Sequence, residues 1–499
     1  MNSSDPLLQP FTLKHLTLKN RIISTSHEPA YSEDGLPKTR YRLYHEEKAK
    51  GGLALTMFGG GTLVAPDAAP AYGNLYAGDD RIVPYFRTLA EAVHRHGAAT
   101  MCQITHLGRR TSSYAGHWLP AIAPSSIREP AHRAFPKAME DWDIRRVVRS
   151  YGAAAIRCRE GDLDGIEVEA YGHLFDSFWS PALNHRADRY GGSLENRMRF
   201  GIEVLQEIRR QVGDDYIVGI RMVFDEMLDG GLAFDEGMKI GEILTNSGLI
   251  DFISVIRGHI ETSAGLADVI PNMGTPGAPY LAFAGEIKQA FDLPVMHAAR
   301  INDVATARYA VREGLLDLVG MTRAHLADPH IVAKIIRGEE DQVRPCVGAG
   351  YCIDRIYGEG EALCLHNPAT GREASMPHVI GPSTEARRRV VVVGAGPAGL
   401  EATRVCASRG HEVILMEAAD RPGGQINLAA RVLRRKEILG ITDWLFDQVE
   451  RLGVTIRLGC YAEAFTVEAE RPDIVIIATG GVPNLAFLGE DQALATSSW

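Results

Sequence analysis

Short apolar runs of strand length recur along the first two thirds of the chain, and longer segments with a different rhythm separate most of them. The runs cover residues 21–25, 52–58, 98–104, 164–170, 216–222, 250–256, 293–298 and 316–322. Segments such as 194–211, 234–246 and 303–314 repeat their apolar positions about every 3.6 residues, which is typical of amphipathic helices. Residues 11–19 alternate apolar and polar side chains and predict a small hairpin ahead of the first run.

Eight strand-like runs, most of them followed by helix-competent sequence, predict an α/β fold whose N-terminal part, residues 1–340, is a (β/α)8 TIM barrel. An open doubly wound sheet would also alternate strands and helices. The count of eight and the lack of a glycine-rich nucleotide turn after the first run favour the closed barrel. Several runs are apolar at nearly every position, as expected of parallel strands that are buried on both faces.

The rhythm breaks at residues 341–386, which are rich in Gly, Pro and Cys and show no clear period. We interpret this segment as a linker that carries a site. Residues 387–499 are predicted to form a partial Rossmann-like dinucleotide-binding domain, with strands at 390–393 and 412–417. The chain ends soon after the Ala-Thr-Gly run at 478–480, so we expect this domain to be incomplete, through truncation or unusual reduction.

The composition is that of a folded chain, because 45% of the residues are hydrophobic, 23% are charged and the formal net charge is -10. No extended basic segment is present, so nucleic acid is not an expected partner. The N-terminus lacks the pattern of a secretory signal, and no run of about 18 apolar residues predicts a membrane span. The seven cysteines are an odd, sparse set, which predicts a reducing, cytoplasmic location.

Polar residues follow the predicted strands at the end where a TIM barrel carries its active site. Arg221, Arg300 and Arg323 stand in or just after the fifth, seventh and eighth runs, and Gln103 lies in the third. Arginines that converge on one barrel mouth repel each other unless an anion lies among them, and FMN would supply one. Arg300 and Arg323 would then hold the phosphate, while Arg221 and Gln103 reach the flavin ring. The alternative is that these arginines pair with rim carboxylates.

A glycine-rich turn marks the second domain. Gly394, Gly396 and Gly399 follow a predicted strand and open a predicted helix, and Glu417 comes 18 residues after the last of them. This context predicts a site for FAD or an ADP moiety, because the glycines let the backbone approach a pyrophosphate and the acid binds ribose hydroxyls. The Gly-Gly-Gln425 run resembles a later part of flavin-disulfide-reductase-type domains.

Four stretches carry a resemblance to a known family. They are residues 18–21 (LKNR), 102–109 (CQITHLGR), 184–197 (NHRADRYGGSLENR) and 317–329 (DLVGMTRAHLADP). With them the whole chain resembles the old-yellow-enzyme family, in the branch that contains trimethylamine dehydrogenase and 2,4-dienoyl-CoA reductase. Within that branch it is most similar to demethylases of dimethylglycine or N-methylproline. Members of the branch join an FMN barrel to an iron–sulfur segment and a dinucleotide domain.

The resemblance implies residue roles. FMN contacts fall on Ser26, Gly59, Gln103, Arg221, Arg300, Thr322 and Arg323, and catalytic positions fall on Glu169, Tyr171, His173 and His259. Trimethylamine dehydrogenase ties its FMN to a cysteine just after the first strand. This chain has Glu28 at that position, so a covalent cysteinyl flavin is not expected.

The linker cysteines bear on an iron–sulfur site. The branch places [4Fe-4S] ligands at positions 346, 349, 352 and 364, whereas this chain has Cys346, Cys352 and Cys364 but Ala349. Three thiolates could hold a cluster if His366 or solvent completed it. Otherwise the three cysteines are remnants of a lost site.

The leading hypothesis is an FMN-dependent oxidoreductase of the amine dehydrogenase or demethylase type. It would remove an N-methyl group from a small amino acid, such as dimethylglycine or N-methylproline, by hydride transfer to the flavin. Aromatic candidates for cation–π contact with the ammonium are Tyr171, Phe178 and Trp179. His173 or His259 would accept the ammonium proton, and Arg257 would bind a substrate carboxylate.

Two other hypotheses remain open. An NAD(P)H-dependent 2,4-dienoyl-CoA or enone reductase would use the same flavin, with His173 as the proton donor. A non-catalytic flavoprotein or scaffold is the third. For the demethylase, electrons would pass to an electron-transfer flavoprotein or a similar acceptor, and the chain is expected to form a homo-oligomer.

Overall fold

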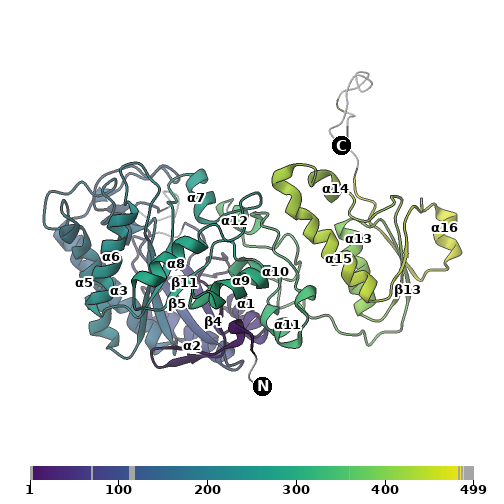
Figure 1. The fold of residues 1–499 in the computed structure, drawn as a ribbon, viewed down its shortest axis with the longest axis horizontal. Helices are drawn as coiled ribbons and strands as arrows, with labels where there is room; N and C mark the ends of the chain where they lie inside the picture. Colours follow the sequence, from purple (N-terminus) through teal and green to yellow (C-terminus); the bar gives the residue numbers. More distant parts are fainter. Residues whose placement is uncertain are drawn as a thin grey trace. The chain divides into compact units, whose positions relative to one another are not determined.

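The computed structural model describes residues 4–68, 71–111, 119–358, 360–481, 484 and 487. The chain divides into two compact units, Met1–Cys346 with Gly350–Met376, and Val347–Ala349 with Pro377–Trp499. The first unit contains a closed barrel and the second a four-stranded sheet (Figure 1).

Eight parallel strands close the barrel, hydrogen-bonded in the order β10-β11-β12-β3-β4-β5-β8-β9. Their bounds are β3 (Ile22–Ser24), β4 (Leu55–Leu63), β5 (Ala99–Thr105), β8 (Gly165–Ala170), β9 (Ile217–Val223), β10 (Phe252–Ile256), β11 (Val295–His297) and β12 (Leu318–Gly320). Each lies on one of the eight predicted runs, so the TIM barrel is confirmed and the open sheet is wrong for this unit.

Strand β4 extends further than the sequence predicts. It continues through the glycines at 59–61, and its register to β5 shifts between Phe58 and Thr62. Gly59 and Gly61 have φ angles of 72° and 88°, which side chains with a Cβ rarely adopt. The glycines therefore permit a local irregularity, after which the strand continues to Leu63.

Helices surround the barrel, and shorter helices lie in the connections between its strands (Figure 1). Their bounds are α1 (Thr39–Lys50), α2 (Val83–His94), α3 (Asp141–Glu160), α4 (Leu174–Ser177), α5 (Leu194–Val212), α6 (Phe234–Ser247), α7 (Ser263–Val269), α8 (Leu281–Ala290), α9 (Val304–Arg312), α10 (Thr322–Ala327), α11 (Ile331–Arg337) and α12 (Tyr351–Tyr357). The predicted helices correspond to α5, α6 and α9. Helix α12 was missed, because its seven residues lie in the linker between Gly350 and Gly358 and are too few to show a period.

A hairpin closes the amino-terminal end of the barrel. Strands β1 (Phe11–Leu13) and β2 (Leu16–Leu18) pair antiparallel, as predicted. Leu13 and Leu18 are buried in the same cluster as Leu55 and Met296, which lie on barrel strands. The hairpin therefore seals the floor of the barrel and leaves the carboxyl ends of the strands for a site.

The second unit is a parallel sheet in the order β15-β14-β13-β16. Its elements are β13 (Arg389–Val393), α13 (Pro397–Ser408), β14 (Glu412–Met416), α14 (Ile426–Ala429), α15 (Leu439–Arg451), β15 (Thr455–Arg457), α16 (Ala464–Ala469) and β16 (Ile474–Ile477). The first two strands match the predicted ones. Val390, Val391 and Val392 are buried at the centre of the sheet, which explains their continuous apolar run.

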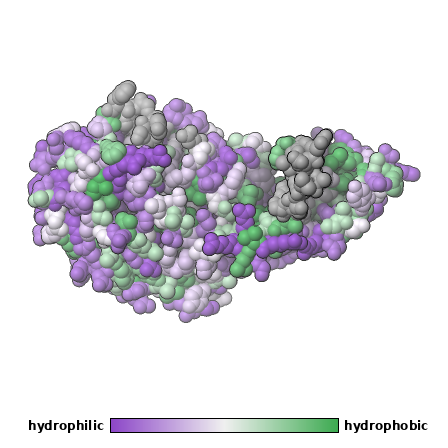
Figure 2. Space-filling model, turned by 90° about the horizontal axis from the view of Figure 1, so that it is seen from above, coloured by the Kyte–Doolittle hydropathy of each residue, from purple (hydrophilic) through white to green (hydrophobic). Residues whose placement is uncertain are grey.

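Polar residues dominate the visible surface of the barrel unit. Figure 2 shows hydrophilic residues across much of that face, with hydrophobic ones scattered among them. Among the residues that the structure describes, no helix combines the length and the apolar character needed to cross a bilayer.

Candidate active site

A cavity of about 220 Å³ lies at the carboxyl ends of the barrel strands. Residues in or just after every strand line it, among them Ser26, Glu28, Gly60, Arg110, Glu169, His173, Arg221, Arg257, Ala299 and Arg323. This is the face on which TIM-barrel enzymes build their active sites. The cavity therefore collects side chains from eight distant parts of the sequence.

Three predicted flavin contacts meet at a carboxylate that was not predicted as a contact. Glu167, on β8, is fully buried. It accepts hydrogen bonds from Ser26 Oγ at 3.1 Å and Gln103 Nε2 at 2.6 Å. Arg221 Nε lies 3.2 Å from the same Glu167 oxygen, and Arg221 Nη1 donates to the Ser26 carbonyl at 2.9 Å. We call these four residues the Glu167 cluster.

The Glu167 cluster keeps polar atoms for a ligand. Within the described residues, Arg221 Nη2 and Glu167 Oε2 are buried without a hydrogen-bond partner. Burial raises the pKa of Glu167, and the Arg221 guanidinium opposes that shift. Unsatisfied buried groups are costly, so a ligand that offers an acceptor to Arg221 is expected here. The polar edge of a flavin ring provides such acceptors, so the residues fit FMN. Arg221 does pair with a carboxylate, as the alternative predicted, yet it retains a free donor atom.

The backbone after β11 is strained. Ala299 and Arg300 have φ angles of 67° and 62°, although neither is glycine. Such residues persist where the surrounding structure fixes them, and they concentrate at functional sites. Arg300 Nη1 donates to the Asn272 carbonyl oxygen, and Arg323 Nη1 lies 3.4 Å from Asn272 Oδ1. The two arginines predicted to bind phosphate therefore converge on one residue.

Close packing joins β12 to β3 beside this corner. A Cβ on Gly320 would lie 2.7 Å from Thr25 Cγ2, so only glycine fits there. Thr322 Oγ1 accepts the Thr25 backbone N–H at 2.9 Å and hydrogen-bonds the Thr25 hydroxyl at 2.7 Å. Thr322 and Arg323 both line the cavity, as predicted for FMN contacts.

Three predicted catalytic residues lie together. Glu169, Tyr171 and His173 all line the cavity. His173 Nε2 lies 3.5 Å from Glu169 Oε1, and the Tyr171 and His173 rings are 6.2 Å apart. His173 Nδ1 is buried without a hydrogen-bond partner in the described part of the chain. Burial and the nearby Glu169 raise the pKa of the Tyr171 hydroxyl. The group thus offers a neutral phenol beside an imidazole with a carboxylate partner.

Other predicted residues lie elsewhere. His259 is not among the described residues that line the cavity, and its Nδ1 accepts the Glu261 N–H at 3.2 Å. Gly60 rather than Gly59 reaches the cavity. The proposed aromatic contacts from Phe178 and Trp179 are wrong. Both side chains are buried core residues outside the cavity, because their helical turn points them at α5, where Phe178 stacks on Phe200.

Arg257 lines the cavity as expected, but its charge is already shared. Its guanidinium lies 3.1 Å from Asp225 Oδ2 and stands over the Phe283 ring at 4.8 Å. About a third of the side chain is exposed, at 34%. It remains able to meet a ligand carboxylate at the edge of the cavity.

Sequence reasoning missed a buried arginine with two tyrosines. Arg110, 2% exposed, lies 3.2 Å from the hydroxyls of both Tyr72 and Tyr357. The Tyr72 and Tyr357 rings meet at 5.1 Å, and all three residues line the cavity. Arg110 also pairs with Glu129 at 3.1 Å. Its place directly after the 102–109 motif was a usable signal, whereas Tyr72 and Tyr357 lie in segments without a period.

The linker thiols lack the fourth cysteine of the expected cluster. Burial raises the pKa of Cys364 to about 12 and also raises that of Cys352. Among the residues that the structure describes, no three His, Cys, Asp or Glu side chains are placed to hold a metal ion. Ala349 supplies no ligand, so Cys346, Cys352 and Cys364 do not fit a four-thiolate cluster. Cys352 instead lines the cavity.

The glycine turn of the second unit has the predicted form. Gly394 has a φ of 104°, and a Cβ there would lie 2.5 Å from the Ala478 carbonyl oxygen. A Cβ on Gly396 would meet nothing within 4 Å, so space remains above the turn at the start of α13. Glu417 accepts the N–H groups of Ala395 at 2.6 Å and Ala419 at 2.8 Å.

Gln425 stands at the start of α14 and faces the end of the described chain. Its Nε2 donates to the Gly481 carbonyl oxygen at 2.7 Å. The predicted dinucleotide residues thus gather around the turn, where backbone N–H groups and a helix N-terminus can meet a pyrophosphate.

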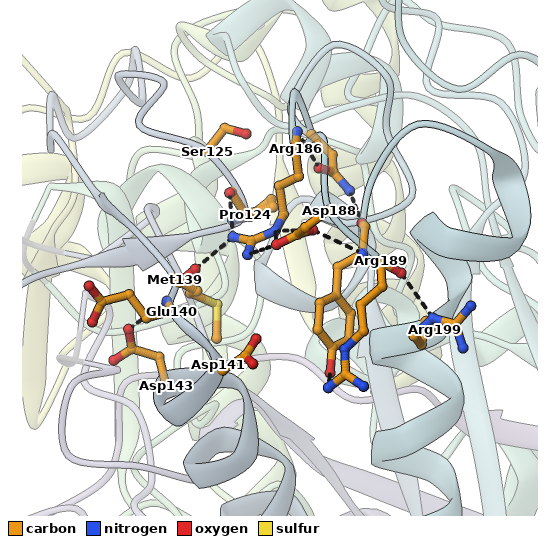
Figure 3. Close-up of polar contacts among 12 residues, drawn as sticks. Pro124, Ser125, Met139, Glu140, Asp141, Asp143, Arg186, Asp188, Arg189 and Arg199 are labelled. Carbon is orange, nitrogen blue, oxygen red and sulfur yellow. Dashed lines mark hydrogen bonds and ion pairs between the residues drawn. The ribbon is translucent and has the colours of Figure 1, made fainter.

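The motif at 184–197 has a structural role outside the cavity. Arg186 Nη1 donates to the carbonyl oxygens of Pro124 at 3.1 Å and Met139 at 2.6 Å, and its guanidinium pairs with Asp188 (Figure 3). Pro124 and Met139 directly follow the short strands β6 (Ile122–Ala123) and β7 (Lys137–Ala138). The motif therefore ties the loop before α5 to this small sheet, and none of its described residues lines the cavity.

Comparison with known proteins agrees with this geometry. Residues 6–342 match the NADH:flavin oxidoreductase / NADH oxidase family, and residues 369–499 match the pyridine nucleotide-disulphide oxidoreductases. The chain is 56% identical to the probable N-methylproline demethylase of Rhizobium meliloti (strain 1021), over 99% of this chain and 73% of that protein. It is 53% identical to the multifunctional alkene reductase/demethylase OYE of Caballeronia cordobensis, over 97% of this chain and 71% of that protein.

A solved structure agrees as well. A complex of 2-naphthoyl-CoA reductase with 2-naphthoyl-CoA superposes with a TM-score of 0.91 at 27% identity, over 97% of this chain and 76% of that one. The barrel, its cationic mouth and the family match point the same way. The chain belongs to the NADH:flavin oxidoreductase / NADH oxidase family and is a flavin-dependent oxidoreductase.

Proposed function

We propose that this enzyme oxidatively demethylates a small N-methylated amino acid of the dimethylglycine or N-methylproline type. The observation that carries the proposal is the buried Glu169–His173 pair, with Tyr171 beside it, in the cavity that also holds Arg221 of the Glu167 cluster. The identity of 56% to a probable N-methylproline demethylase supports the same substrate class.

Ser26, Gln103 and Arg221 would hold the FMN ring, and Arg300, Thr322 and Arg323 would hold its phosphate. FMN, when bound, supplies the acceptor for a hydride from the N-methyl group. The cavity residues would prepare the amine, which must lose its proton before its carbon–hydrogen bond can be oxidised.

His173 is the proposed proton acceptor. Its Nδ1 is buried and unpartnered within the described residues, so it can take the ammonium proton inside the cavity. Glu169, 3.5 Å from Nε2, would stabilise the imidazolium that results. Tyr171 would pack against the amine, and Arg257 would bind the substrate carboxylate at the exposed edge.

We also infer roles beyond the barrel. The second unit would bind FAD or an ADP moiety at Gly394, Gly396, Gly399, Glu417 and Gln425. Electrons would leave to an electron-transfer flavoprotein or a similar acceptor protein. No step is assigned to an iron–sulfur cluster, because Ala349 stands where the fourth thiolate is expected.

Anaerobic mixing of the FMN-loaded protein with N-methylproline or dimethylglycine tests the proposal. We expect the visible flavin absorbance to bleach. Water should hydrolyse the resulting iminium to the demethylated amine and formaldehyde, in equal amount to the reduced flavin. Proline, which lacks the methyl group, is the control and should leave the spectrum unchanged. If no N-methylated amino acid bleaches the flavin, the proposal is wrong.

A second candidate is an NAD(P)H-dependent alkene reductase. Its support is the position of His173 at the cavity, where an imidazolium could protonate a substrate carbon, and the similarity to an alkene reductase/demethylase. Alkene-dependent NADPH oxidation with a 2,4-dienoyl thioester, in the absence of any response to N-methylated amino acids, would favour it.

A further inference from the structure

A second carboxylate in the cavity has no role in the scheme above. Glu28 follows β3 and lines the cavity. Its Oε1 accepts the Ala30 N–H at 2.8 Å, whereas its Oε2 is buried and has no hydrogen-bond partner among the described residues. A carboxylate oxygen left unpaired in a buried site calls for a ligand that carries a proton or a positive charge.

Glu169 presents a similar oxygen to the same space. The residue is 2% exposed. Its Oε1 faces His173, but its Oε2 is buried without a hydrogen-bond partner in the described part of the chain. The two carboxylates therefore each keep one oxygen free, in addition to the bonds that fix their positions.

Two consecutive glycines of β4 lie beside these two residues. A Cβ on Gly60 would lie 2.4 Å from the Glu28 backbone nitrogen, and a Cβ on Gly61 would lie 3.6 Å from Glu169 Oε2. Glu28 and Glu169 thus flank consecutive residues of one strand. Any larger residue at position 60 would push the Glu28 backbone away.

Neither carboxylate is directly paired with a lysine or arginine in the described residues, although Arg221 and Arg257 line the same cavity. Among the same residues, Glu169 has only His173 as a basic neighbour within ion-pair distance. Burial raises the pKa of Glu28 well above its usual range, and the nearby Cys102 and Glu169 raise it further. Two buried carboxylates in one cavity are destabilising unless a cation or a proton lies with them.

The surrounding groups select the kind of cation. Tyr72, Tyr171 and Tyr357 line the same cavity, and aromatic faces attract alkylated ammonium groups. In the described part of the chain no set of side chains is placed to hold a metal ion. We propose that Glu28 and Glu169 form the subsite that binds the charged amine of the substrate. The inference rests on the proposed function and adds the residues that recognise the cation.

Calorimetric titration of the FMN-loaded full chain with two probes tests the inference. Trimethylglycine carries a quaternary ammonium that cannot lose a proton, and 3,3-dimethylbutanoate has the same shape with carbon in place of nitrogen. Because the charged contact to the ammonium is lost when carbon replaces nitrogen and the carboxylate is kept, the wild-type protein should prefer trimethylglycine by about 10- to 100-fold.

Amide variants locate the preference. Glu28→Gln and Glu169→Gln keep the shape of the side chain, and each should lose about 10-fold or more of the affinity for trimethylglycine with little change for 3,3-dimethylbutanoate. Glu226→Gln is the matched control, since Glu226 is a buried carboxylate outside the cavity, bonded to Ser180 Oγ at 2.7 Å. It should keep the wild-type preference. FMN content and melting temperature check that each variant is folded.

The outcomes separate the two proposals. If N-methylated amino acids bleach the flavin but the wild-type protein does not prefer trimethylglycine, or the two amide variants keep that preference, the cation subsite is wrong and the demethylase remains. If N-methylated amino acids do not bleach the flavin and neither probe binds, both the proposed function and the cation subsite are wrong.

Discussion

The two nucleotide sites of this chain are built in opposite ways. The barrel mouth uses charged side chains from distant strands, and the Glu167 cluster leaves atoms of Arg221 and Glu167 unpaired within the described residues. The glycine turn uses backbone, and both oxygens of Glu417 are already bonded to backbone N–H groups. The first site therefore depends on single side chains, whereas the second depends on backbone conformation.

Removal of one charge should damage the barrel site most. Arg221→Ala leaves Glu167 buried without its guanidinium, and breaking a buried ion pair in this way costs about 3–5 kcal/mol of unfolding free energy. We expect lower stability in urea and loss of FMN, measured as flavin per chain. Arg210→Ala is the control, because Arg210 is exposed and pairs with Glu207 on the outer surface. An Arg221→Ala protein that keeps its FMN would contradict the account of the Glu167 cluster.

A rise in pH should lower the stability of the barrel. Burial raises the pKa of Glu226 to about 7, and its Oε2 accepts the Leu232 N–H at 2.6 Å. A carboxyl whose folded pKa is raised contributes stability below its unfolded pKa and loses that contribution as pH rises through the folded pKa. The pKa of Glu226 rises from a usual value of 4.5 to about 7 in the folded protein. The free energy of unfolding should therefore fall by roughly 3 kcal/mol as the pH rises from 4.5 to 7 and stay at the lower level above pH 7.

Hydrogen exchange at several pH values, read separately for barrel and second-unit peptides, measures this effect. Glu226→Gln should flatten the barrel profile and leave the second unit unchanged. A wild-type barrel that is equally protected at pH 5 and pH 8 would show that Glu226 is not the group responsible.

Small residues should matter most in the second site. Gly394→Ala places a side chain at a φ of 104° and 2.5 Å from the Ala478 carbonyl oxygen, with an expected strain of about 1–3 kcal/mol. Gly396→Ala meets no protein atom within 4 Å, so it should keep the fold yet obstruct a pyrophosphate. We expect both variants to lose FAD and keep FMN when the released nucleotides are separated and quantified. Retained FAD in Gly396→Ala would disprove the close approach of backbone to phosphate.

The sequence predicted the barrel well because eight short apolar runs alternate with helix-competent segments. Several of these runs are apolar at nearly every position, as expected of strands buried on both faces. Residues 184–197, the most specific motif, predicted the family correctly but not a site, since Arg186 and Asp188 fix a loop. A motif reports that residues are constrained, and packing constrains them as strongly as chemistry does.

The site was harder to predict where loops decide it. Glu167 alternates with Glu169 along one strand, so the local pattern does not single it out. Its bonds to Ser26 and Gln103 depend on the closure of the barrel. Tyr357 comes from a helix too short to show a period, and His259 turns toward its own loop. Such placements follow from tertiary contacts that no local pattern encodes.

The hairpin beneath the barrel has a consequence for turnover. Leu13 and Leu18 pack into the base of the barrel and close it, so the cavity opens at the carboxyl ends of the strands. The amine that enters, and the iminium or its hydrolysis products that leave, would pass through that same opening. The enzyme would then work in alternating half-cycles, and each half-cycle would start only after the previous ligand has left the cavity.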